Sequence, residues 1–144
     1  MAPDADFAPK YRGVMTPEEA RELNPLVLAY IGDGVQMLYL RARYAASSHA
    51  KAGKLHVLVS AKARATAQAK AADALADVLT PEEAEVFRRG RNSHSGSSAK
   101  NASIVEYRKA SGLEAVFGYL YLTGADARLE ELLRLSAEED RSAT

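Results

Sequence analysis

The chain has 144 residues, enough for one domain with a sizeable hydrophobic core, and it contains no cysteine, which excludes disulfides and cysteine-ligated metals. Hydrophobic residues make up 47% of it, yet no uninterrupted apolar run approaches ~20 residues and no early segment has the pattern of a signal peptide. Lys/Arg and Asp/Glu number 19 each, so the formal charge is zero, and we expect a cytoplasmic protein with no membrane partner.

Helix-start signals organise the first part of the chain. Residues 1–15 hold two of the five prolines and show no sustained periodicity, so we expect a mobile tail. Thr16-Pro17 then combines a hydroxyl cap with a proline in the first turn. Asn24-Pro25 repeats this signal and opens a helix that we expect to run to about Tyr44. Because apolar residues cover most of its circumference, the pattern predicts a central helix.

The later elements are predicted from caps and apolar periodicity in the same way. Thr80-Pro81 copies the first cap, and Ser103 has Glu106 in the capping-box position. These signals predict helices over residues 55–78, 80–90, 103–121 and 126–135, with a polar, basic loop over 91–101. No segment shows strand alternation, so the fold class is all-α. We expect one domain over 16–136 and a frayed acidic tail over 137–144.

Charge is segregated along the chain despite the zero sum. Residues 41–109 carry 13 Lys and Arg against 6 Asp and Glu, a net charge of +7, and the remainder therefore carries −7. A basic middle segment is typical of a protein that binds a polyanion, but it also arises where charged side chains simply solvate helix faces. The charge pattern alone leaves both interpretations open.

Two carboxylates interrupt the most apolar helices of the prediction. Asp33 lies between Gly32 and Gly34, and Glu114 lies one turn before Gly118. A carboxylate removed from water needs a cation, a basic partner or a shifted protonation state, because its burial alone costs several kcal/mol. The glycines suggest close backbone approach or ligand access.

These two acids could converge where their helices cross. Paired carboxylates with room for water suit Mg²⁺, which keeps much of its hydration shell and is commonly shared with substrate phosphates. An ion pair with an arginine or a cap-like hydrogen bond is the competing explanation for each acid. His94 in the basic loop could act on a phosphate or could be a solvated loop residue, and both possibilities stay open.

Three separated motifs resemble bacterial Mini-ribonuclease III. They are residues 24–35 (NPLVLAYIGDGV), 89–92 (RGRN) and 107–120 (YRKASGLEAVFGYL), in the family's order. The family consists of a ribonuclease III catalytic domain without an appended double-stranded-RNA-binding domain. The resemblance implies an all-helical homodimer that cleaves double-stranded RNA with Mg²⁺ and matures the large-subunit (23S) ribosomal RNA precursor.

The resemblance also assigns roles to individual residues. Asp33 and Glu114 match the superfamily's metal-binding, catalytic acids. Ala29 stands where the superfamily has a further glutamate, and Ser111 where an aspartate is common, as in the Mini-III branch. Since the catalytic domain must then grip the duplex itself, the candidate RNA-binding residues are Arg89, Arg91, Asn92 and Lys100, with Lys62 and Arg108 behind them.

The sequence thus favours a Mg²⁺-dependent endoribonuclease. The alternative is a non-catalytic RNA-binding or ribosome-associated module on the same scaffold, and a purely structural helical domain is a third reading. Whether a large-subunit ribosomal protein must present the RNA is left open by the sequence.

Overall fold

The computed structural model describes residues 13–93 and 103–142, with side chains as far as residue 138. Within these residues all regular secondary structure is helical, which confirms the all-α prediction. None of the described helices is both long and apolar enough to cross a membrane. In chain order the helices are α2 (Pro17–Glu22), α3 (Pro25–Ser48), α4 (Ala52–Ala63), α5 (Ala65–Leu75), α6 (Pro81–Asn92), α7 (Ile104–Leu122) and α8 (Asp126–Ser142).

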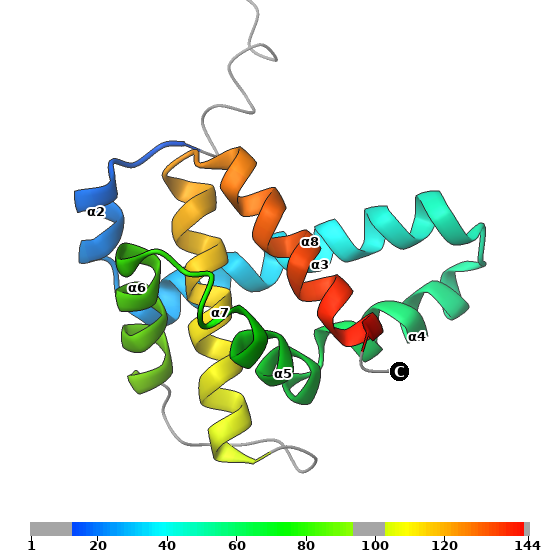
Figure 1. Ribbon diagram of the computed structural model, residues 1–144. Helices are drawn as coiled ribbons and strands as arrows, with labels where there is room; N and C mark the ends of the chain where they lie inside the picture. Colours follow the sequence, from blue (N-terminus) through cyan, green and yellow to red (C-terminus); the bar gives the residue numbers. More distant parts are fainter. Residues whose placement is uncertain (1–12, 94–102, 143–144) are drawn as a thin grey trace, which may run out of the picture.

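Helix α7 forms the centre of the molecule (Figure 1). It is buried almost all round over its second half, and helices α3, α5, α6 and α8 pack against it. The largest fully buried side chain, Phe117, lies on α7, and Leu28 of α3 and Leu132 of α8 pack into the same core. The second half of α3 extends away from this core, and α4 folds back beside it (Figure 1).

The predicted capping signals form as expected. At the start of α6 the Thr80 hydroxyl accepts from the Glu83 backbone N–H at 3.1 Å, and the Glu83 carboxylate accepts from the Thr80 backbone N–H at 2.9 Å. The same reciprocal pair occurs at Thr16 before α2 and at Ser103 before α7. Each box satisfies two backbone donors that a helix start would otherwise leave without partners.

The predicted helix over residues 55–78 is wrong in one respect, because it is two helices. Arg64 has an extended backbone, with φ −66° and ψ 155°, and separates α4 from α5. The Gln68 side chain stabilises this break by donating from Nε2 to the Ala63 carbonyl at 2.6 Å. The break depends on this side-chain hydrogen bond. The sequence around Arg64 contains neither the proline nor the glycine that would usually indicate a break.

Helix α3 is longer and less central than its sequence predicted. It continues to Ser48, and one of its apolar faces is open to solvent, with Tyr30 79% and Leu38 70% exposed. Helix α8 likewise continues to Ser142, past the predicted end near Leu135. Although apolar residues cover most of the circumference of α3, part of this apolar surface is exposed in the single chain.

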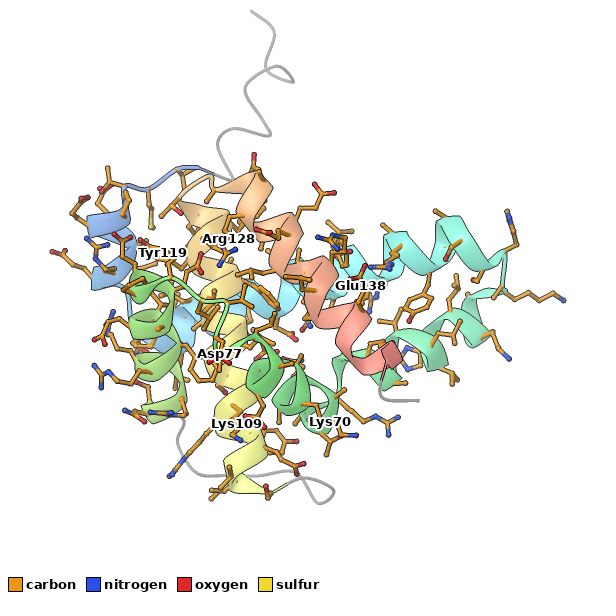
Figure 2. The ribbon with its side chains drawn as sticks, in the orientation of Figure 1. Lys70, Asp77, Lys109, Tyr119, Arg128 and Glu138 are labelled. Carbon is orange, nitrogen blue, oxygen red and sulfur yellow. The ribbon has the colours of Figure 1, made fainter. Side chains whose placement is uncertain are left out.

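A buried ion pair that the sequence analysis missed ties α8 to α6. Arg128 of α8 donates from Nε at 2.9 Å and Nη2 at 2.8 Å to the two oxygens of Glu83. The same guanidinium donates to the Val78 carbonyl at 2.8 Å and to Glu131 at 2.9 Å. Figure 2 shows Arg128 on the side of α8 that faces this segment. These bonds hold α8 against the segment that precedes α6 and against the first turn of α6.

Candidate active site

Helices α3 and α7 approach each other so closely that two glycines are required at their crossing. A Cβ on Gly32 would overlap the Glu114 carbonyl, and a Cβ on Gly118 would overlap the Leu28 carbonyl. The sequence prediction of close backbone approach is confirmed at these two positions. At Gly34 a Cβ would meet nothing within 4 Å, so close approach does not apply there and the alternative of ligand access stays a prediction.

This crossing brings the two predicted acids together. The side chains of Asp33 and Glu114 share a hydrogen bond. Asp33 is exposed in the single chain, contrary to the burial that its apolar neighbours suggested, and Glu114 is partly buried. The two acids therefore form a pair at the edge of the core, where one side remains open to solvent.

The protonation of Glu114 reflects this setting. Burial, followed by the hydrogen bond and the negative charge of Asp33, raises the pKa of Glu114 to about 8, while a hydrogen bond from Gln68 acts in the opposite direction. A carboxyl can hydrogen-bond to a carboxylate only when one of the two carries a proton. Among the described residues, the side chains that act on the pKa of Glu114 are Asp33 and Gln68. The ion pair with an arginine, which was the competing explanation for Glu114, is therefore not found there.

Gln68 is the site residue that sequence reasoning missed. Its Nε2 lies 3.4 Å from Oε2 of Glu114, and the side chain is 3% exposed. A signal was present, because Gln68 lies three, four and seven residues before Ala71, Ala72 and Leu75, which are buried on α5. A single amide on the apolar stripe of an alanine-rich helix indicates a polar partner in the core.

The two positions at which the resemblance predicts further acids in the superfamily hold small, buried residues here. Ala29 is 6% and Ser111 is 8% exposed. Over residues 13–93 and 103–138, no three His, Cys, Asp or Glu side chains gather in a way that could hold a metal. The site therefore offers two carboxylates, a donor set that suits a hydrated Mg²⁺ shared with phosphate oxygens.

The candidate RNA-binding residues lie in different environments. Arg89 has a structural position, since its Nη1 donates to the Arg21 carbonyl at 2.6 Å and its Nη2 lies 3.5 Å from the Leu23 carbonyl, at the end of α2. Arg91 lies over the Phe87 ring and bonds to the exposed Asn92 through Nε at 3.3 Å. These two residues occupy the last turn of α6.

The remaining candidates lie on α4 and α7. Lys62 donates to the Ala137 carbonyl of α8 at 3.4 Å, and Arg108 is exposed on α7. Its neighbour Lys109, labelled in Figure 2, pairs with Asp73 of α5 at 2.8 Å. Lys100 and His94 lie outside the described residues. An RNA-binding role for any of these side chains stays a prediction.

Comparison with known proteins identifies the family of this chain. The Ribonuclease III domain family matches residues 26–125, which include both acids. The chain is 45% identical over 122 residues to the Mini-ribonuclease 3 of Clostridium tetani, covering 83% of this chain and 80% of that protein. It is 40% identical over 125 residues to the Mini-ribonuclease 3 of a Thermoanaerobacter species, covering 87% and 88%.

The fold is also found in a solved structure. A crystal structure of a protein from Fusobacterium nucleatum superposes with a TM-score of 0.74 at 24% identity, covering 82% of this chain and 94% of that one. At this identity the likeness concerns the fold alone. The matched domain includes both acids, and the sequence identities extend over most of the chain. The chain therefore belongs to the Mini-ribonuclease 3 family of ribonuclease III-domain proteins.

Proposed function

We propose that this endoribonuclease uses Mg²⁺ held by Asp33 and Glu114 to hydrolyse phosphodiester bonds in double-stranded RNA. The observation that carries the proposal is the close crossing of α3 and α7 at Gly32 and Gly118, which brings Asp33 near enough to Glu114 to act on its protonation. A second negative charge on this pair is unfavourable without a basic partner, and a divalent cation that displaces the shared proton offsets it. The raised pKa of Glu114 supports the same fit, because burial, followed by the hydrogen bond and charge of Asp33, disfavours its ionised form and no basic side chain is among the causes.

The chain's own residues contribute position and charge to the reaction. Asp33 and Glu114 would hold the ion, and bound Mg²⁺ supplies activation of water and stabilisation of negative charge at the phosphate. The close crossing fixes the backbone of Glu114 against α3, so the distance between the two acids is set by the core. Rigid placement of this kind is the main structural contribution to such catalysis.

We propose that the enzyme acts as a homodimer through the exposed apolar face of α3. A groove of about 720 Å³ lies between α3 and α8, and its lining includes Ile31, Val35, Leu38, Leu129 and Leu133. Contiguous apolar surface of this kind is typical of an interface between protein chains. In a two-fold dimer the two sites face opposite strands of one duplex, which gives a staggered double cut.

The duplex would be gripped by the basic residues near α6 and α7. The candidates are Arg89, Arg91, Asn92 and Lys100, with Lys62 and Arg108 behind them, and Lys100 lies outside the described residues. A-form RNA offers phosphates, 2′-hydroxyls and shape, which suit cationic and amide side chains. The substrate that we propose is the 23S ribosomal RNA precursor in the bacterial cytoplasm, with a large-subunit ribosomal protein as a further partner.

A duplex cleavage assay tests this function. Purified protein is incubated with end-labelled double-stranded RNA in Mg²⁺ and then with excess chelator, and the product ends are mapped. We expect staggered cuts that disappear with chelator, and no cuts from Asp33→Asn, which should keep the fold. Near-normal cleavage by Asp33→Asn would overturn the assigned role. Duplex binding without metal-dependent products would favour the non-catalytic RNA-binding module.

A further inference from the structure

The Gln68 amide joins three helices behind the acidic pair. It projects from α5, and its single nitrogen reaches both the Ala63 carbonyl at the end of α4, at 2.6 Å, and Glu114 Oε2 on α7, at 3.4 Å. A primary amide has two N–H donors, so one group can serve both acceptors. The short bond to the Ala63 carbonyl fixes the nitrogen, and the second N–H is left for Glu114.

The orientation of this amide is determined by its neighbours. If the nitrogen and oxygen were exchanged, Gln68 would place an acceptor 2.6 Å from the Ala63 carbonyl oxygen. That contact would be repulsive. The nitrogen therefore faces Glu114, and the Gln68 oxygen points away from the acidic pair.

Gln68 lines a small cavity together with a second glutamine, Gln36. Oε1 of Gln68 and Oε1 of Gln36 are both buried and have no hydrogen-bond partner among the described residues. Both residues line a cavity of about 10 Å³ between α3, α4, α5 and α8. That volume is close to the space one water needs, and a water has two protons to donate. Gln36 lies on α3, three residues after Asp33.

We propose that Gln68 is a positioning residue for Glu114 in metal binding, anchored by the Ala63 carbonyl and by one buried water that it shares with Gln36. This inference rests on the proposed role of Glu114 as a metal ligand. The amide occupies one lone pair of Oε2 and restricts rotation of the carboxylate, which orients the remaining lone pairs for the ion. Partners of this kind behind a ligand typically contribute 10- to 100-fold in metal affinity or activity.

The test uses two matched substitutions at the cavity. Gln68→Met and Gln36→Met each replace a buried amide with an apolar chain of similar length, but only Gln68 contacts Glu114. Mn²⁺ binding to the RNA-free protein is measured by electron paramagnetic resonance, and unfolding by urea. We expect Gln68→Met to weaken Mn²⁺ binding about 10-fold and Gln36→Met less than about 3-fold. Equal losses in the two variants, or none in Gln68→Met, would overturn the proposal.

Two further measurements keep the outcomes distinct. Wild type and Glu114→Gln are titrated with Mn²⁺ in parallel. If wild type does not bind, or if Glu114→Gln binds equally well, the proposed function fails, whatever Gln68 does. If Gln68→Met does not fold, side-chain amide NMR of the wild type decides. We expect the Gln68 NH₂ signals to shift on Mg²⁺ addition and both glutamines to show a nuclear Overhauser effect to a bound water, and unshifted Gln68 signals would count against the role.

Discussion

Gly32 lies directly against the backbone of Glu114, and no side-chain carbon fits between them. The contact joins the helix that carries one acid to the residue that supplies the other. Because Asp33 follows Gly32 immediately, the spacing of the two carboxyl groups depends on this crossing. Under the proposed function, stability and catalysis are therefore coupled at one position.

Gly32→Ala should damage both properties. The added methyl must push α3 from α7, an overpacking that costs about 3 kcal/mol, and displacing Glu114 by about 1 Å should reduce cleavage ~100-fold. Urea unfolding and single-turnover cleavage measure the two effects. Gly53→Ala on α4 is the matched control, because a Cβ there meets nothing within 4 Å and alanine favours the helix. If Gly32→Ala behaved like this control, the close crossing would not hold in solution.

The stability of the metal-free protein should fall as pH rises toward and through the pKa of Glu114. That pKa is raised from 4.5 to about 8 by burial and by Asp33, so between these values the folded state holds a proton that the unfolded state has lost. The stabilisation is complete below the unfolded value and is lost as pH rises. From pH ~5.5 to ~8.5 we expect a loss of about 1–2 kcal/mol in urea unfolding with chelator present.

Asp33→Asn provides the control for this pH dependence. Removing the neighbouring charge eliminates one of the causes that raise the pKa of Glu114. The pH slope of the unfolding free energy should then become smaller than in wild type. Equal slopes in the two proteins would assign the dependence to other groups.

The helix starts and the convergence of the two acids could be predicted from the sequence. Caps are local, so Thr16, Thr80 and Ser103 could be identified from a few adjacent residues. The convergence of Asp33 and Glu114 could be predicted because each lies in an apolar helix with a glycine next to it or one turn away. That combination is informative wherever two helices must cross closely.

Features that depend on distant partners could not be predicted in this way. The break at Arg64 depends on the Gln68 amide, and the position of Gln68 depends in turn on α7. The partly buried pair of Glu83 and Arg128 joins residues 45 apart in the sequence. Local patterns do not contain this information.

Arg128→Met should destabilise the protein by about 3 kcal/mol, because it leaves the buried Glu83 carboxylate without its partner. Burial acts to raise the pKa of Glu83, but hydrogen bonds from Arg128 and Thr80 outweigh it and lower the pKa. This contribution is present above the unfolded value and is lost as pH falls through the folded one. Urea unfolding at neutral and acidic pH should therefore show the two proteins converging at low pH.

Arg134→Met is the control for that measurement. Arg134 pairs with Glu138 at 3.2 Å on the exposed face of α8, with both side chains more than 40% exposed. Exposed pairs contribute about 0–1 kcal/mol, so its loss should be small at either pH. Comparable losses in both variants would show that the burial of the Glu83 pair has no special effect.

Leu38→Lys should convert the proposed dimer to a monomer. Leu38 is 70% exposed in the single chain and lines the groove between α3 and α8, so a charge there would lose its hydration at the interface. Sedimentation velocity gives the mass. Val57→Lys is the control, since Val57 is 63% exposed on α4 and does not line this groove. A dimeric Leu38→Lys protein at micromolar concentration would place the interface elsewhere.

Alanine substitutions of Arg89 and Arg108 should have different effects, the first on stability and the second on RNA binding. Arg89 bonds to carbonyls at the end of α2, so Arg89→Ala should lower the unfolding free energy by about 1.5–3 kcal/mol. Arg108 is exposed, so Arg108→Ala should change it by less than about 0.5 kcal/mol. If Arg108 contacts a phosphate, duplex affinity in an Asp33→Asn background should fall, and the salt slope should decrease by about 1. An unchanged slope would remove Arg108 from the RNA-binding surface.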